Sequence, residues 1–297
     1  MIPNGDGLSC SQCPKKYEKK HQVWQCFASN LSELSKDEIH YHDHLRDDDV
    51  EVHQLNAYRN NFFHNKVWNY IRRVPKSGLL LEIGAGIGYD AKNFVSDYSL
   101  TVLDISTNSL EHFLEHITTP VVAVAADGAC LPFVDGSFDG VYTIATFHHM
   151  EDYAKSMHEL WRVLKPGGRL VIGIEPNAFY FKMIKKVRGL LCHATHTDAH
   201  EGSHADAEMT GFTEKQFYML LSGDGWKNVS IEPMWFLTGL LHYKLEFLYR
   251  ALKLKKRIIL PVWLEKGIVG LDSLLFKIPG VKHLCWHWIV TAKKMGT

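Results

Sequence analysis

Short apolar segments alternate with amphipathic ones from Leu79 onward, and this alternation constrains the fold more than any other feature. Apolar runs bounded by turn residues predict strands, and the segments between them have the spacing of helices. Strand and helix in alternation predict an α/β fold, with a mostly parallel sheet covered by helices on both faces. The predicted strands are 79–83, 100–103, 121–125, 140–145, 169–174, 228–234 and 286–293, and the main predicted helices are 36–73, 90–96, 107–116, 153–164, 179–191 and 213–222.

A glycine-rich turn follows the first predicted strand. Gly84, Gly86 and Gly88 alternate there, so the backbone can approach a ligand closely. A dinucleotide fingerprint that begins at Gly84 would need its third glycine at position 89, which is Tyr89. The spacing therefore argues against a nicotinamide or flavin cofactor.

Polar side chains follow the next three predicted strands. Asp104 lies about 20 residues beyond the glycines, where a carboxylate can accept both hydroxyls of a ribose. Asp127 follows the third strand, and His148 and His149 follow the fourth. Ligands of such sheets bind at the carboxyl ends of the strands, so we expect these side chains to share one site.

In this order, the motifs resemble those of the class I S-adenosylmethionine-dependent methyltransferases, in particular the small-molecule branch that includes quinone-biosynthesis enzymes. The resemblance extends over residues 79–176. It implies a Rossmann-like, seven-stranded sheet and S-adenosyl-L-methionine as the cofactor. The cofactor-binding residues that it implies are Glu82, Gly84, Ala85, Gly86 and Gly88 for the methionine part, Asp104 and Ile105 for the ribose and adenine, Asp127, Gly128 and Ala129 for the adenine, and Ala145 near the sulfonium.

For methyl transfer the protein chiefly has to align the acceptor with the methyl group and exclude water, because a sulfonium already carries an electrophilic methyl and its leaving group. A phenol or hydroxyl acceptor must also lose a proton, and histidine is the side chain that ordinarily titrates near neutral pH. His148 and His149 are therefore the candidate catalytic residues. The alternative is that either histidine only hydrogen-bonds the sheet edge or a neighbouring helix.

Charge and hydropathy exclude several other classes of protein. Lys and Arg together number 33, as do Asp and Glu, so no net field attracts a polyanion, and we do not expect a nucleic-acid partner. No apolar run approaches the roughly 20 residues of a spanning helix. The first residues also lack the apolar stretch of a secretory signal. We expect a cytoplasmic protein.

The flanks of the core are expected to carry the specificity. We predict a cysteine-containing segment over 1–35, a helical extension or lid over 36–76, and the methyltransferase domain over 77–297 with a helical cap inserted at about 236–284. Cys10, Cys13, His21 and Cys26 have the residue types of a zinc site, although their spacing departs from that of zinc knuckles. The alternative is a set of free thiols.

Residues 241–264 combine an apolar helical face with the basic run Lys253, Lys255, Lys256 and Arg257. One interpretation is a cap packed on the core, and the other is peripheral membrane contact by a segment that receives a lipid-like acceptor.

We therefore expect methyl transfer to a small-molecule or lipid-like acceptor, at oxygen before nitrogen or carbon. The alternatives are an RNA methyltransferase with a zinc-binding head, or a non-catalytic cofactor-binding regulator or partner subunit. The sequence does not determine the oligomeric state.

Overall fold

The computed structural model describes residues 2–4, 7–9, 16–27, 31–43, 57–183, 186, 210–223, 225–256 and 258–296. Within these residues a nine-stranded sheet has the order β11-β12-β10-β9-β6-β7-β8-β5-β4. Six adjacent strands run parallel, from β10 to β5, while β12 and β4 are antiparallel to their neighbours. The strands are β4 Lys19–Lys20, β5 Val23–Gln25, β6 Leu79–Ile83, β7 Ser99–Asp104, β8 Val122–Ala125, β9 Phe138–Ile144, β10 Leu164–Pro176, β11 Trp226–Met234 and β12 His287–Lys294.

The sheet is wider than predicted. All seven predicted strands form. In addition, β5 pairs parallel with β8, and β4 pairs antiparallel with β5. The segment containing both strands was predicted to lie outside the sheet. An edge strand such as β8 would otherwise expose unpaired backbone groups, and β4 places Lys19 and Lys20 at the new edge, where charge opposes further pairing. A second small sheet joins β1 Ile2–Asn4, β2 Gly7–Ser9 and β3 Lys16–Tyr17.

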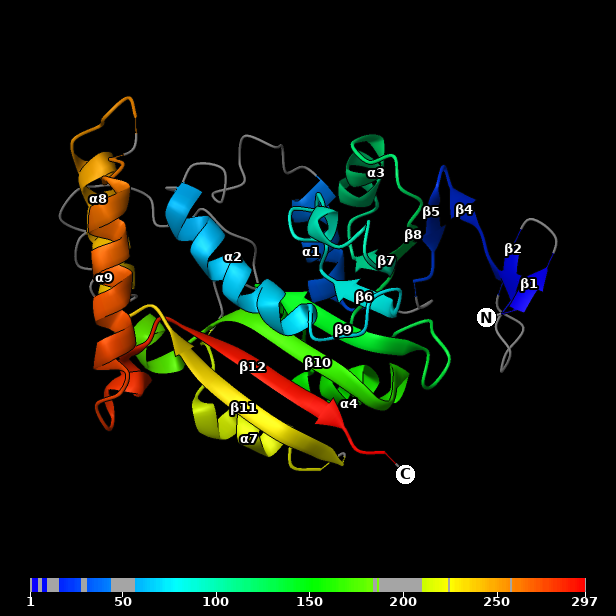
Figure 1. Cartoon of the computed structure of the whole chain (residues 1–297). Helices are drawn as coiled ribbons and strands as arrows, with labels where there is room; N and C mark the ends of the chain where they lie inside the picture. The colour runs from blue at the N-terminus through cyan, green and yellow to red at the C-terminus, as the bar shows by residue number, and fades with distance from the viewer. Residues whose placement is uncertain are drawn as a thin grey trace.

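Helices cover both faces of the sheet, as Figure 1 shows. Side chains of β6 alternate between two cores, since Leu80 packs on one face and Leu81 on the other. The face of Leu80 is covered by α2 and α3, and the face of Leu81 by α4 and α7. The helices are α1 Glu33–Asp43, α2 Ala57–Ile71, α3 Thr107–Glu115, α4 Tyr153–Val163, α7 Glu214–Leu220, α8 Leu237–Ala251 and α9 Val262–Leu275, with 3-10 turns η3 Ala91–Asn93, η4 Phe147–His149 and η5 Val281–Leu284.

One helix prediction was wrong in extent. The stretch 90–96 forms only η3, because the Asp90 carboxylate accepts hydrogen bonds from His64 (2.7 Å) and Trp68 (2.6 Å) of α2 and caps no helix. The stretch 36–73 contains α1 and α2, and residues 44–56 lie outside the described part. Of the predicted helix 179–191, residues 179–183 and 186 are described, and all of them are helical. A capping box formed by Thr213 and Gln216 begins α7, within the predicted helix 213–222.

The insertion over 236–284 contains α8 and α9, which pack side by side at one end of the molecule (Figure 1). Asp272 of α9 joins the two, since its buried carboxylate accepts from the amides of Phe236, Leu237 and Thr238 at the start of α8. No helix among the described residues is long and apolar enough to cross a membrane.

Candidate active site

A cavity of about 870 Å³, including its open mouth, lies at the carboxyl ends of β6, β7, β8 and β9. It is where the strand order predicts a ligand site. Seven of the predicted cofactor residues line it, and four residues of α1 close it from the other side. The lining residues are Leu34, Ser35, Glu38, His42, Ile83, Gly84, Gly86, Leu103, Asp104, Ile105, Ala126, Asp127, Gly128, Ile144, Ala145, Thr146, His149, Met150 and Glu151.

The three glycines of the turn serve different purposes. A Cβ on Gly84 would lie 2.1 Å from the side chain of Thr146, and one on Gly88 would lie 1.9 Å from the ring of Phe113. A Cβ on Gly86 would meet no protein atom within 4 Å, although its φ of +50° is one that glycine favours. Gly84 and Gly88 therefore allow packing, whereas Gly86 leaves open the space that a ligand would fill.

Asp104 anchors this turn to the second strand. One of its carboxylate oxygens accepts from the amide of Gly86 at 2.7 Å, and the other accepts from the amide of Ser106 at 2.8 Å. Each carboxylate oxygen has two lone pairs, so capacity remains on both for the hydroxyls of a ribose. The side chain lines the cavity with only 7% exposure, which makes such bonds stronger than in water.

Asp127 lies across the cavity, after β8. Its Oδ1 accepts from the amide of Ala129 at 2.8 Å, and its Oδ2 accepts from the hydroxyl of Ser35 in α1 at 3.4 Å. The adjacent Gly128 also lines the cavity. A Cβ there would lie 2.9 Å from Cε of Met150, so a side chain at this position would displace the end of Met150.

Four predicted cofactor residues do not line the cavity: Glu82, Ala85, Gly88 and Ala129. Glu82 lies beneath the turn with 2% exposure and accepts from the Tyr142 hydroxyl at 2.8 Å. Burial raises the pKa of Glu82 well above its usual range, the charge of Asp90 adds to this, and the Tyr142 hydrogen bond opposes it. Glu82 is therefore part of the buried core next to the turn.

The two candidate catalytic histidines occupy different environments. His149 lines the cavity, and its Nδ1 lies 3.2 Å from Oε2 of Glu38. His148 does not line the cavity, and its Nδ1 lies 2.9 Å from Oε2 of the fully buried Glu175. The Glu175 carboxylate also accepts from the amides of residues 146–148, so it holds the turn that presents His149. Glu175 itself does not line the cavity.

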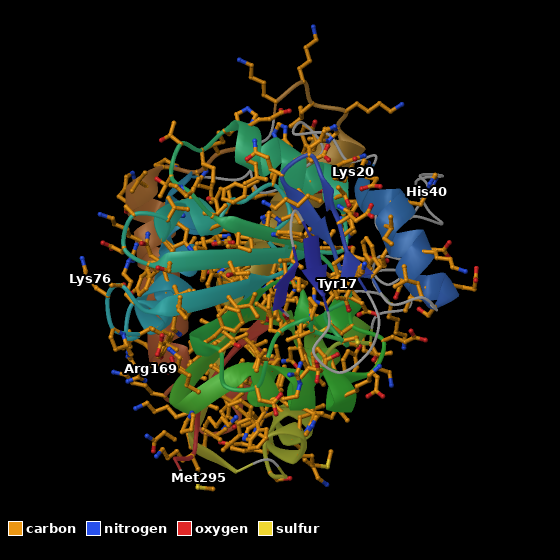
Figure 2. All side chains as sticks on the ribbon, turned by 90° about the vertical axis from the view of Figure 1, so that its right-hand side faces the viewer. Tyr17, Lys20, His40, Lys76, Arg169 and Met295 are labelled. Carbon is orange, nitrogen blue, oxygen red and sulfur yellow. The ribbon has the colours of Figure 1, made fainter. Side chains whose placement is uncertain are left out.

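Sequence reasoning missed the contribution of α1. Leu34, Glu38 and His42 follow one another at intervals of four residues and therefore share one face of the helix. That spacing of a glutamate and a histidine is the signal that could have identified the face. In Figure 2 His40 labels α1, and Lys20 labels the added strand β4. The helix is also tied to the core by its last residue, since Asp43 accepts from the Ser106 hydroxyl at 2.6 Å.

The predicted zinc residues are only partly described. Cys10 and Cys13 lie outside the described residues. Cys26 is 4% exposed in the core, and the exposed His21 pairs with Glu111 at 2.8 Å. The zinc site stays a prediction.

The cavity fits the cofactor that the motifs imply. Space opens at Gly86, a carboxylate with remaining acceptor capacity stands at Asp104, and a second stands at Asp127. The described lining carries Glu38, Asp104, Asp127 and Glu151 and contains no lysine or arginine. An acidic lining suits a ligand that bears positive sulfonium and ammonium groups.

Comparison with known proteins agrees with this geometry. Residues 81–172 match a family described as a methyltransferase domain. The 2-methyl-6-phytyl-1,4-hydroquinone methyltransferase of Synechocystis is 29% identical over 229 residues, which are 72% of this chain and 65% of that protein. The 27-O-demethylrifamycin SV methyltransferase of Amycolatopsis mediterranei is 36% identical over 101 residues, 32% of this chain and 37% of that protein. The chain thus spans less than two thirds of either relative.

Among solved structures, phosphoethanolamine N-methyltransferase 2 of Haemonchus contortus, in complex with S-adenosyl-L-methionine, has a similar fold. The TM-score is 0.56 at 19% identity, over 91% of this chain and 62% of that one. The family match covers the glycine turn, Asp104, Asp127 and His149, which are the residues that surround the cavity. Residues 81–172 are therefore similar to the methyltransferase-domain family, and the fold around them is similar to that of an S-adenosyl-L-methionine-binding methyltransferase.

Proposed function

We propose that this protein transfers a methyl group to an oxygen of a small-molecule or lipid-like acceptor. The observation that carries the proposal is that one cavity joins the cofactor residues Gly86, Asp104 and Asp127 to the pair His149 and Glu38. When bound, the cofactor supplies an activated methyl group and its leaving group. The names of the relatives support the acceptor class, since they describe a phytyl hydroquinone and an O-demethylated rifamycin.

In the proposed reaction, some residues would bind the cofactor and others would remove the proton of the acceptor. Asp104 and Asp127 hold the two ends of the nucleoside, and Gly86 admits it to the turn. His149 faces the remaining space, where it takes the proton of an acceptor hydroxyl. Glu38 accepts from Nδ1 of His149 and so leaves Nε2 as the unprotonated nitrogen, which orients the ring for that task. His148 and Glu175 position the turn and do not touch the acceptor.

Product labelling tests the proposal. The protein is incubated with methyl-labelled cofactor and separate pools of small molecules, lipids and RNA. We expect label in the first or second pool, with an acid- and base-stable methyl ether as the product. Label in RNA alone would instead support a nucleic-acid acceptor, and no label in any pool would support a cofactor-binding regulator. Asp104→Ala should abolish both labelling and cofactor binding, whereas His149→Gln should abolish labelling and keep cofactor binding.

We further infer that the tip of the α8–α9 hairpin contacts a lipid surface, from which the enzyme takes an apolar acceptor. Leu252, Ile259 and Trp263 are 63%, 68% and 73% exposed at this tip. Lys253, Lys255 and Lys256 are exposed beside them, a pattern that favours an anionic interface. Exposed tryptophan suits the headgroup region, because its ring is apolar and its N–H is polar.

Vesicle sedimentation tests this contact. The protein should sediment with vesicles that contain anionic lipid at low salt, and less so at high salt, because lysine attraction is screened. The variant I259S/W263S should lose most of this binding. Val134→Ser removes a 57% exposed apolar side chain from the loop before β9 and should leave it unchanged. Equal sedimentation of all three proteins, or none at low salt, would show that the tip does not bind lipid.

A further inference from the structure

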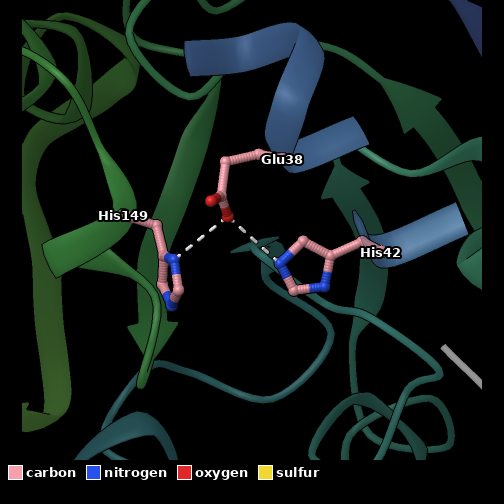
Figure 3. Close-up of side chains that lie close together, drawn as sticks. All are labelled: Glu38, His42 and His149. Atoms are coloured by element: carbon pink, nitrogen blue, oxygen red, sulfur yellow. Dashed lines mark hydrogen bonds and ion pairs between the residues drawn. The ribbon is translucent and has the colours of Figure 1, made fainter. Parts of the chain in front are cut away.

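Three metal-ligating side chains meet at the mouth of the cavity. Glu38 lies between His42 and His149, as Figure 3 shows. Oε2 of Glu38 is 3.2 Å from Nδ1 of His149 and 3.3 Å from Nε2 of His42. One ligand atom from each residue lies within 4.8 Å of the other two.

We propose that Glu38, His42 and His149 bind a divalent transition-metal ion. An ion about 2.1 Å from each ligand atom separates neighbouring ligand atoms by roughly 3.0 to 3.4 Å. Both measured separations from Glu38 fall in this range. The third, between the two histidines, can be brought into it by rotation of His42, whose side chain is 30% exposed.

The two elements that carry the ligands hold them rigidly. Glu38 and His42 are four residues apart on one face of α1, a spacing that commonly places two ligands on one ion. His149 ends the turn η4, whose amides are bound by Glu175. The tie between Asp43 and Ser106 fixes the end of α1 next to His42. Little rearrangement is needed to form the site.

Charge supports a cation at this place. The side chain of Glu38 is only 5% exposed, and a carboxylate removed from water needs a compensating charge or hydrogen bonds. Three further carboxylates line the cavity, Asp104, Asp127 and Glu151, and its described lining contains no lysine or arginine. Two imidazoles and one carboxylate favour zinc, manganese, iron or cobalt over magnesium or calcium, which prefer oxygen ligands.

Ion binding changes the tautomers but not the number of protons. Without the ion, Nδ1–H of His149 and Nε2–H of His42 donate to Glu38; with it, each proton moves to the other nitrogen of its ring. Three protein ligands leave positions for an acceptor oxygen, whose proton is then lost to solvent more readily. The bound ion thereby replaces Nε2 of His149 in promoting loss of this proton, because Nε2 is protonated when Nδ1 binds the ion. This consequence rests on the proposed function, whereas ion binding itself does not.

Cobalt(II) titration of the metal-free full-length protein tests the site. The visible absorption of cobalt reports its coordination, and equilibrium dialysis counts the ions bound per chain. We expect the parent to bind one more ion per chain than Glu38→Gln and His149→Gln. The affinity of each variant for cobalt should be about 100-fold lower or more, because even residues that only hydrogen-bond a metal ligand contribute 10- to 100-fold to metal affinity. His42→Gln, which removes the most exposed ligand, should show the same loss with an unchanged circular dichroism spectrum.

A second cluster provides the matched control. His112, Glu115 and His116 lie on the exposed face of α3 and could bind cobalt weakly. His116→Gln should keep the ion at Glu38, and the histidine-rich segment 193–208 is the same in every variant, so its contribution cancels. Equal binding by the parent, Glu38→Gln and His42→Gln would overturn the proposal, as would no binding by the parent. Methyl transfer by a protein that binds no ion would leave the proposed function standing.

Discussion

At the scale of single residues, Gly86 separates ligand binding from folding. Gly86→Ala adds a methyl group that meets no protein atom, so it costs only about 1 kcal/mol for a left-handed backbone. The same methyl enters the space that the cofactor would fill. We expect a melting temperature a few degrees below that of the parent and cofactor binding weakened by more than about 10-fold. Calorimetric titration with S-adenosylhomocysteine measures the second effect.

Gly84→Ala is the matched comparison within the same turn. Its new Cβ would lie 2.1 Å from Thr146, so we expect it to lower the melting temperature well beyond the effect of Gly86→Ala. Equal loss of stability in both variants would contradict the distinction. So would unchanged cofactor binding in Gly86→Ala.

The predicted residues that line the cavity are those whose position follows from the strand ends. Asp104 and Asp127 line the cavity because parallel strands end at one edge of the sheet. His148 and His149 could not be distinguished, since their separation depends on the buried Glu175 of another strand. Glu38 could not be placed at all, because no local pattern says where α1 docks on the sheet.

At the scale of elements, Asp272 holds the helical hairpin together. It accepts from three amides at the start of α8, at 3.0, 2.7 and 3.1 Å, and is 4% exposed. Asp272→Ala leaves these amides without their acceptor, which we expect to lower the free energy of unfolding by about 2 kcal/mol. Hydrogen exchange should show faster opening confined to α8.

Asp152 provides a surface control for this effect. It caps α4 by accepting from the single amide of Lys155 at 3.0 Å. Asp152→Ala should cost about 1 kcal/mol and leave exchange in α8 unchanged. If Asp272→Ala cost no more than Asp152→Ala, the cap would not be what joins α8 to α9.

The core elements were predictable, whereas their partners at the edges were not. Seven strands contain runs of apolar residues, so each can be identified from its own sequence. β5 has only three residues, and it becomes a strand because β8 offers an open edge. Its pairing extends the sheet with a segment from far away in the sequence, which periodicity within that segment cannot reveal.

At the scale of the whole molecule, an overall charge of zero conceals an uneven distribution. Lysines gather at the exposed tip of the α8–α9 hairpin, while carboxylates gather in the cavity at the carboxyl ends of the strands. The described lining of that cavity would attract cations, and the tip would attract anionic surfaces. Net charge therefore excludes long-range attraction of a polyanion but says nothing about either site.

The acid stability of the whole fold should depend on His287. Nδ1 of this residue is buried without a hydrogen-bond partner. Burial, together with the neighbouring His148 and His242, lowers the pKa of His287 from 6.5 to about 3. Below pH 6.5 the unfolded chain binds a proton that the folded protein does not, so stability falls as pH falls from about 6.5 toward 3. The loss from this residue between pH 7 and pH 5 is on the order of 1 to 2 kcal/mol.

His287→Phe removes the proton-binding group while keeping an aromatic ring against Trp286, which now stacks on it at 13°. We expect the variant to lose less stability than the parent between pH 7 and pH 5, measured as the difference in urea unfolding free energy at the two values. His158→Phe replaces an exposed histidine that stacks on Trp161, so it is the matched control for loss of one imidazole and should keep the parent dependence. If His287→Phe lost as much unfolding free energy between pH 7 and pH 5 as the parent, His287 would already be protonated in the folded protein at pH 5. That result would contradict its burial beside two other histidines.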